Sequence, residues 1–446
     1  MTNYGMTNER LKLGFFGAVV VLLALVLLSG VGLAQSSTTT QAQASAEPTI
    51  THYSLSPEKL QKATALYHIE LVFLTLVTLY GFLILLGLLR FDIGPRLRNI
   101  AERVSRFRFV QAYIFAPLLL LTIAVLNLPF DIYRQNVERE YGISVQSWGS
   151  WFWDWTKGQL VSYVIFSFVI WLLYLIIRRS PRRWWFYFWL ASLPITIFVV
   201  FITPVLLDPL FNKFEPLAQK NPALVQALHR VTERGGLDIP ENRMYEMKAS
   251  EKLTVYNAYV TGIGATKRVV VWDTTEHDMT IPETMFVFGH EMGHYVLNHI
   301  WKGLAFTSLL LLVGLYVGYR IANASMDRWG DRLGIRALGD WASLPLLMLI
   351  LAVLTFIAQP IASGFSRYIE HQADVYGLEV THGLVPDSGM TAAVAFQKLG
   401  EKSYDYPYPN RLFVIWEYDH PPIPDRLLFS LRYHPWNEGE PTAFVK

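Results

Sequence analysis

Long apolar runs separated by polar stretches form the main pattern of this chain. Seven runs have the roughly 17–25 residues that an apolar helix needs to cross a bilayer. They are Leu13–Ala34, Leu71–Leu89, Phe109–Leu128, Leu160–Ile177, Trp184–Leu207, Leu304–Ala322 and Leu344–Phe365. The pattern predicts a mainly α fold built on a seven-helix transmembrane bundle.

The N-terminal segment 1–34 allows two interpretations. Its apolar run follows Arg10 and Lys12 and ends in small residues before Gln35, which is typical of a cleaved signal peptide. Its length suits a retained first span equally well. The next segment, 35–66, begins with a low-complexity run of Ser, Thr, Gln and Ala. We expect it to be a flexible polar linker before spans two to five, in 67–207.

Two polar stretches, 208–302 and 366–446, flank spans six and seven in 303–365. In the first stretch, NPALVQALHRVTERGG predicts an amphipathic helix that ends at its glycines. VYNAYVTGIGATKRVVVWDTT predicts two strands around a glycine-containing turn. A further helix is expected from Thr280, which has capping-box spacing to Glu283.

Composition supports the membrane assignment. Hydrophobic residues make up 52% of the 446 residues and charged residues 17%, whereas soluble proteins carry roughly 25% charged residues. The net charge of +2 is too small to indicate nucleic acid, so the expected environment is the lipid bilayer and no nucleic-acid partner is expected. Because the chain has no cysteine, any metal must be held by histidine and carboxylate side chains.

Arginines mark one side of the predicted membrane. The connections between spans two and three, four and five, and six and seven are rich in arginine, and the opposite connections are poorer. Connections rich in Arg and Lys usually face the cytoplasm. The distribution therefore places 208–302 and 366–446 together on the non-cytoplasmic face, where they can form one domain.

The segment MFVFGHEMGHYVLNHI carries the candidate chemistry. On a helix of about 3.6 residues per turn, His290 and His294 lie one turn apart on the same face. Two imidazoles at this spacing can bind one Zn²⁺, and Glu291 can reach a metal-bound water without ligating the metal. A solvated helix surface can carry the same pattern, so a third ligand decides between the two interpretations.

The predicted topology selects the third ligand. The first glutamate after Glu291 is Glu370, which follows span seven on the same side of the membrane. The intervening aspartates lie in the connection on the other side; they are Asp327, Asp331 and Asp340. Three protein ligands leave a fourth position open, as in catalytic zinc sites. We therefore expect one Zn²⁺ per chain.

Further polar residues are candidates for supporting roles. Asp374 lies one helical turn after Glu370, and we expect it to accept the second N–H of a ligating histidine. His420 and Arg426, in DHPPIPDRL, can donate to the oxyanion of a tetrahedral intermediate. A structural ion pair explains Arg426 equally well. We expect His299, one place short of a third-histidine pattern, to be a solvated or capping residue.

Five motifs occur in a fixed order: PLFNKFEPL, NAYVTGIGATKRVVVWDT, FGHEMGH, SRYIEHQAD and HPPIPDR. Together they resemble the type I CAAX prenyl endopeptidase family of integral-membrane zinc metalloproteases, of the gluzincin type. The resemblance implies a chamber enclosed by the seven helices and capped by a zincin-like protease domain. It implies the same three metal ligands, Glu291 as general base, and His420 and Arg426 lining the site.

The resemblance also implies how a substrate binds. Asn257 matches a position near the substrate backbone, and Arg268–Trp272 resembles the edge strand to which an extended substrate adds. The substrate-binding candidates are thus Asn257, Tyr259, Val269 and Val271. The expected partner is a polypeptide that is membrane-associated or lipidated. Eukaryotic family members place the catalytic domain in the cytosol, on the side opposite to the one that the arginines indicate.

The sequence thus predicts a membrane-embedded zinc endopeptidase in which Glu291 takes the proton of the attacking water. One alternative is a non-catalytic polytopic receptor that binds metal, or a transporter. Another is an intramembrane-cutting metalloprotease of the site-2 type, which holds its HExxH segment within a span. The metal helix here is too polar to cross a bilayer, and no later span contains an aspartate.

The orientation can be tested with a reporter enzyme that is active only outside the cytoplasm. Fused after Lys446, the reporter is expected to be active, because the arginine-rich connections hold the opposite face in the cytoplasm. The matched control is the same reporter inserted after Arg182, between spans four and five, where no activity is expected. Activity at Arg182 and none at Lys446 would show the reverse orientation.

Overall fold

The computed structural model describes residues 50–445, apart from 238 and 263–266. The first predicted span, Leu13–Ala34, lies outside these residues. Within the described part of the chain, 6 helical segments are long and apolar enough to cross a membrane. Their helices are α2 (Pro57–Arg90), α4 (Arg108–Glu140), α5 (Trp148–Arg179), α6 (Trp184–Ile202), α12 (His299–Trp329) and α13 (Leu344–Thr381).

Each of the six remaining predicted spans coincides with one of these segments. The predicted span Trp184–Leu207 covers α6 and the π-helical turn Thr203–Leu207, which leads into α7 (Asp208–Phe211). Pro204 in this turn has no N–H to donate to the preceding turn. The helical membrane fold predicted from the apolar runs is therefore confirmed for the described residues.

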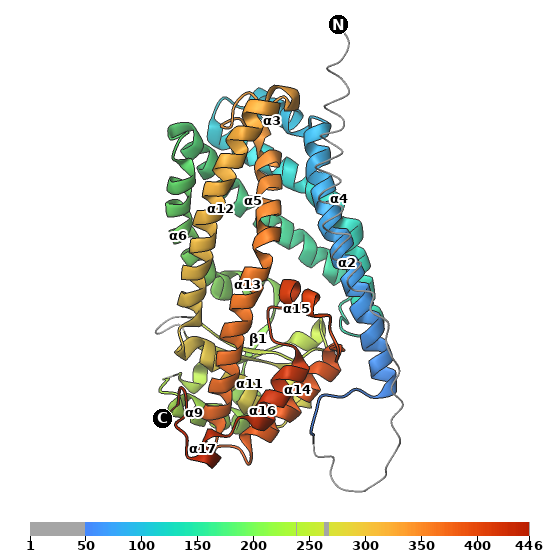
Figure 1. The fold of residues 1–446 in the computed structure, drawn as a ribbon, viewed down its shortest axis with the longest axis vertical. Coiled ribbons are helices and arrows are strands. Elements are labelled where there is room, and N and C mark those ends of the chain that lie inside the picture. Colours follow the sequence, from blue (N-terminus) through green and yellow to red (C-terminus); the bar gives the residue numbers. More distant parts are fainter. Residues whose placement is uncertain (1–49, 238, 263–266, 446) are drawn as a thin grey trace.

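The long helices separate two ends of the molecule (Figure 1). Figure 1 shows α2 and α4 along one side, α6 and α12 along the other, and α3 (Ile93–Val104) at one end. The arginine-rich connections meet near α3, where Arg336 pairs with Glu102 at 3.0 Å. Nearby, Arg178 Nε donates to the Gly339 carbonyl at 2.8 Å. The two polar stretches lie together at the other end, as predicted.

The predicted linker 35–66 is too long at its C-terminal end. Helix α2 already begins at Pro57, where the Ser56 side chain accepts a hydrogen bond from the Lys59 N–H. Tyr53 is buried and donates its hydroxyl to the Asp405 carbonyl at 2.9 Å. Packing of Tyr53 in the core of the polar domain explains why this part of the segment is not a free linker.

A small sheet of four strands lies in the polar domain, in the order β1-β2-β4-β3. The predicted hairpin is confirmed as β3 (Ala258–Thr261) paired antiparallel with β4 (Arg268–Trp272). The other two strands, β1 (Phe214–Pro216) and β2 (Met244–Met247), were not predicted. They contain too few residues to display the alternation of apolar and polar positions that indicates a strand.

The helices around the sheet follow the capping signals of the sequence. Helix α9 (Pro222–Arg234) is capped by Asn221, whose side chain accepts a hydrogen bond from the Leu224 N–H. Helix α11 (Ile281–Val296) begins with the predicted capping box between Thr280 and Glu283. The other short helices are α8 (Leu217–Lys220), α10 (Asp273–Asp278), α14 (Ser388–Ser403), α15 (Arg411–Glu417), α16 (Ile423–Arg432) and α17 (Pro435–Glu438).

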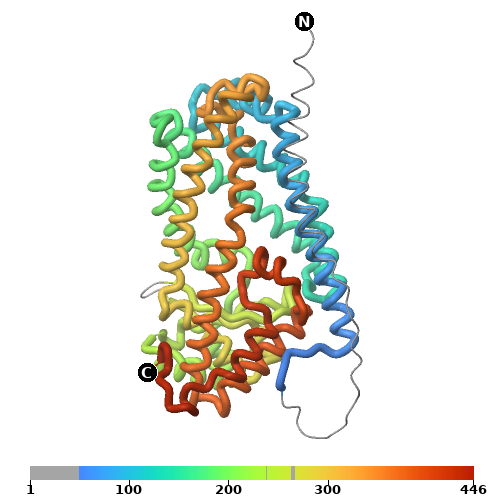
Figure 2. Tube along the Cα trace, in the orientation of Figure 1, coloured from blue at the N-terminus to red at the C-terminus, as the bar shows by residue number. Residues whose placement is uncertain are grey.

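Helix α13 runs without a break from the membrane bundle into the polar domain. Its 38 residues span about 57 Å at 1.5 Å per residue, whereas the hydrocarbon core of a bilayer is about 30 Å thick. The end of α13 therefore reaches beyond the apolar segment and carries Glu370 and Asp374 to α11. Figure 2 shows the same course in the chain trace, with the C-terminal segments gathered beside this end of α13.

Two glycines allow α11 and α13 to pack closely. A Cβ atom at Gly289 would lie 2.8 Å from Val380 Cγ1, and one at Gly377 would lie 3.0 Å from the His290 N. Side chains at these positions would force the helices apart. The buried Glu379 then ties the C-terminal segment to α13 by accepting from the N–H groups of Phe444 at 2.7 Å and Val445 at 2.9 Å.

Candidate metal centre

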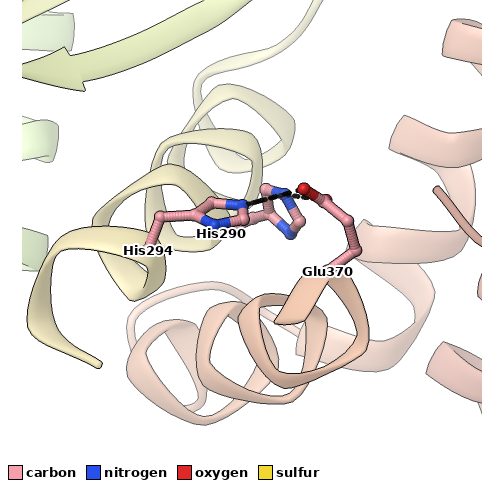
Figure 3. Close-up of side chains that lie close together, drawn as sticks. All are labelled: His290, His294 and Glu370. Carbon is pink, nitrogen blue, oxygen red and sulfur yellow. Dashed lines mark hydrogen bonds and ion pairs between the residues drawn. The ribbon is translucent and has the colours of Figure 1, made fainter. Parts of the chain in front are cut away.

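Three side chains from two helices converge at the contact between α11 and α13 (Figure 3). His290 and His294 project from α11 toward Glu370 on α13. The two Nε2 atoms are 3.2 Å apart. Glu370 lies 3.2 Å from His290 Nε2 through Oε2 and 3.4 Å from His294 Nε2 through Oε1. Two ligands about 2.0–2.1 Å from a tetrahedral ion lie about 3.3 Å apart, so the set matches a metal site.

The ligand atoms of this arrangement suit a metal ion when both histidine rings are neutral. Asp374 Oδ1 lies 2.9 Å from His290 Nδ1, and a carboxylate only accepts, so Nδ1 carries a proton. In the neutral ring, the form that binds a metal, Nε2 then carries the lone pair. Glu370 Oε2 is buried and accepts no hydrogen bond. Lone pairs and a carboxylate that face one another repel unless a cation lies between them. The residues therefore fit a divalent metal ion.

Asp374 is held by a buried arginine. Arg426, on α16, donates to Asp374 through Nε at 2.9 Å and Nη2 at 2.6 Å, in a two-pronged contact. The guanidinium also lies over the ring of Phe396, 4.5 Å from its centroid. The prediction that Asp374 supports a ligating histidine agrees with these contacts. The predicted oxyanion role of Arg426 does not, because its guanidinium is buried and already paired with Asp374.

Glu291 lies beside the three candidate ligands. Burial raises the pKa of Glu291 above the ordinary value of a glutamate, and the nearby His290 and His294 oppose that rise. Among the described residues, none forms an ion pair or a hydrogen bond with the Glu291 carboxylate. A carboxylate with a raised pKa and no protein partner is suited to accept a proton from water.

His420 approaches the metal centre from the C-terminal part of the chain. Its Nε2 lies 3.2 Å from Glu370 Oε2, and its side chain is 49% exposed. Its Nδ1 contacts Asp419 Oδ1 at 2.8 Å, which leaves Nε2 directed toward the centre. Unlike Arg426, His420 is therefore positioned to contact a ligand in the site.

The expectation for His299 is wrong. The sequence predicted a solvated or capping residue, but the side chain is buried and its Nδ1 lies 3.1 Å from His294 Nδ1. The reason is the turn after α11, where Asn298 adopts a left-handed conformation with φ 59. This turn starts α12 at His299 and directs the ring back toward His294. Helical periodicity alone gives no signal of such a turn.

The predicted edge position of Arg268–Trp272, which is β4, is also wrong. Strand β4 is internal, between β2 and β3, and Val269 and Val271 are completely buried in the core. Among the described residues, the free edge next to α11 belongs to β3, which contains Tyr259 and directly follows the exposed Asn257. The high apolar content of β4 makes it easy to recognise as a strand in the sequence. This apolar content reflects a central position in the sheet, where both faces of the strand are buried.

Two known protein families match adjacent parts of this chain. Residues 36–213 match the family described as CAAX prenyl protease N-terminal, five membrane helices. Residues 218–431 match Peptidase family M48. The second match contains all three candidate ligands and the residues around them, including Glu291, His299, Asp374, His420 and Arg426.

Individual relatives agree with the family match. The uncharacterized metalloprotease YhfN of Bacillus subtilis is 36% identical over 335 residues, which cover 75% of this chain and 76% of YhfN. The CAAX prenyl protease 1 homolog of Homo sapiens is 25% identical over 380 residues, covering 74% and 75%. The crystal structure of S. mikatae Ste24p shares the fold, with a TM-score of 0.74 at 23% identity over 85% of this chain and 90% of that one.

Fold, site and relatives define an integral-membrane metalloprotease. The chain belongs to peptidase family M48 and carries the membrane region typical of CAAX prenyl proteases at its N-terminal side. The resemblance noted in the sequence is thereby confirmed.

Replacing Asp374 by Asn is expected to weaken metal binding about 10–100-fold, because His290 loses the carboxylate that fixes its ring. The same change leaves the buried charge of Arg426 without its partner, which is expected to lower the free energy of unfolding by about 3–5 kcal/mol. Metal affinity is measured by chelator competition and stability by thermal unfolding. Asp425→Asn, an exposed change on the same helix as Arg426, is the control. Unchanged metal affinity in Asp374→Asn would contradict the assigned role.

Proposed function

We propose that this protein is a zinc endopeptidase that cleaves extended or membrane-associated polypeptides. The observation that carries the proposal is the convergence of His290, His294 and Glu370 at the spacing of metal ligands. These three residues would hold one Zn²⁺ and leave a position open for substrate or water, as in catalytic zinc sites. A bound zinc ion would supply Lewis acidity toward water and the scissile carbonyl.

Glu291 acts as the general base in this proposal. Its carboxylate lies on the helix of the two histidines and, at its raised pKa, binds a proton more readily than an ordinary glutamate. It takes the proton of the attacking water and delivers it to the leaving amine. His420, oriented by Asp419, donates in its doubly protonated form through Nε2 to the oxygen on which negative charge develops. Arg426 contributes indirectly, by holding Asp374.

The free edge of β3 is the proposed binding site for the substrate backbone. In antiparallel pairs, residues that exchange hydrogen bonds alternate with residues whose N–H and C=O point away from the partner. The Trp272 N–H donates to the Asn257 carbonyl, and Val260 is paired with Val269 three positions further along β3. The backbone N–H of Val260 therefore points to the free edge, where a substrate can add as a further strand.

Two observations bear on the natural substrate. Several relatives carry the name CAAX prenyl protease 1, which makes a lipidated substrate one option. The arginine distribution supports a protease domain outside the cytoplasm, away from prenylated cytosolic proteins. We propose membrane-associated polypeptides on the non-cytoplasmic side as the substrate class, and we do not restrict it to prenylated ones.

Replacing Glu291 by Gln tests the proposed mechanism. The change preserves the size of the side chain but removes the proton acceptor, so kcat for peptide hydrolysis is expected to fall about 10²–10⁴-fold. Zinc content, measured by elemental analysis of the purified protein, is expected to stay at one ion per chain. Glu233→Gln, on the exposed face of α9, is the control and keeps its activity. Full hydrolysis by Glu291→Gln would rule out Glu291 as the base.

Replacing Val260 by Pro tests the proposed substrate strand. Proline is tolerated at a sheet edge but cannot donate a hydrogen bond. One lost backbone hydrogen bond of about 0.5–1.5 kcal/mol corresponds to a rise in KM of roughly 2–10-fold. Val260→Ala retains the N–H and controls for the lost side chain. Equal KM values in the two variants would place the substrate backbone elsewhere.

A further inference from the structure

His299 is a buried histidine whose place in the structure is unexplained by the proposed catalytic steps. His299 is only 3% exposed. Burying a polar group costs free energy unless the group is hydrogen-bonded. Both ring nitrogens have partners: Nδ1 lies 3.1 Å from His294 Nδ1, and Nε2 lies 3.2 Å from Gln372 Oε1. His299 thus joins a candidate metal ligand on α11 to a side chain on α13.

The partners determine the direction of these hydrogen bonds. The Gln372 side chain donates through Nε2 to the Tyr368 hydroxyl at 3.1 Å, so its oxygen faces His299. Because an amide oxygen only accepts, His299 Nε2 carries the ring proton and Nδ1 of the neutral ring accepts. The N–H that it accepts is the Nδ1–H of His294. The lone pair of His294 is then on Nε2, the atom that faces Glu370.

We propose that Tyr368, Gln372 and His299 form a relay that positions His294 for metal binding. The inference rests on the proposed function, since it takes His294 as a ligand of the zinc ion. Metal-binding histidines commonly donate their second N–H to a protein acceptor, which fixes the ring and its tautomer. Asp374 has this position for His290, and His299 has it for His294.

The two histidine ligands are therefore supported by chemically different groups. His290 faces a carboxylate that is itself paired with Arg426, whereas His294 faces a neutral ring. The relay also depends on the break between α11 and α12. On a continuous helix, residues five apart point about 140° away from each other. The left-handed Asn298 removes this separation, so that the first residue of α12 contacts the metal centre.

Zinc affinity of the full-length purified protein tests the relay. Zn²⁺ is competed with a chromophoric chelator in the wild type, His299→Leu and Gln372→Leu. Both variants are expected to bind zinc about 10–100-fold more weakly. His299→Asn keeps an acceptor near the position of Nδ1, and Gln372→Glu keeps an acceptor for His299 Nε2, so both are expected to recover most of the affinity. His229→Leu, at a partly exposed histidine of α9 that faces Glu233, is the control and binds like the wild type.

Two measurements separate positioning from a general loss of stability. Thermal unfolding of the metal-free protein reports stability, and the visible absorption spectrum of the Co²⁺-loaded protein reports the geometry of the ligands. A shifted Co²⁺ spectrum together with weaker zinc binding supports the relay. If His299→Leu does not fold, the pair Gln372→Leu and Gln372→Glu decides, because neither change removes the buried ring.

Wild-type affinity and an unchanged Co²⁺ spectrum in the Leu variants would overturn the relay. That result leaves the proposed function in place as long as the wild type binds zinc and hydrolyses peptide through Glu291. Failure of the wild type to bind zinc would overturn the proposed function and, with it, the relay.

Discussion

The close contact between α11 and α13 is the constraint on which the metal centre depends. His290 and His294 lie on one helix and Glu370 on the other, and the side chains of these residues are too short to bridge widely spaced helices. Gly289 and Gly377 allow the close approach, because a Cβ at either position would collide with the opposite helix. Helix packing in the core of the polar domain thus fixes the distances that a metal requires.

The centre is supported by two layers of hydrogen bonds with different chemistry. On one side, Asp374 and Arg426 form a buried charged pair behind His290. On the other, His299 contacts His294 without any formal charge. Such partners fix the orientation of each imidazole before metal binds, which reduces the cost of ordering the site. These hydrogen bonds also connect the centre to α12, α13 and α16. Because α12 and α13 continue into the membrane bundle, the bundle and the polar domain are joined at the metal centre.

Features set by neighbouring residues were predictable from the sequence, whereas contacts between distant segments were not. The apolar runs, the capping box at Thr280 and the β3–β4 hairpin were predictable because each depends on neighbouring residues. Glu370 was predictable because the crossings of the membrane exclude the intervening aspartates. The partners of Arg426 and His299 were not predictable, since they are set by contacts between segments distant in the chain. The internal position of β4 became evident only with β2, a strand too short to be detected.

The sequence by itself therefore determined the membrane class, the helical spans and the metal-binding pattern HExxH with a later glutamate. These features follow from local periodicity and from the cost of burying backbone polar groups in lipid. Only the tertiary structure decided which polar groups meet behind the ligands and which strand has a free edge. The physical reason is that hydrogen bonds and sheet order depend on distances of a few ångströms between segments, and spacing along the chain does not specify those distances.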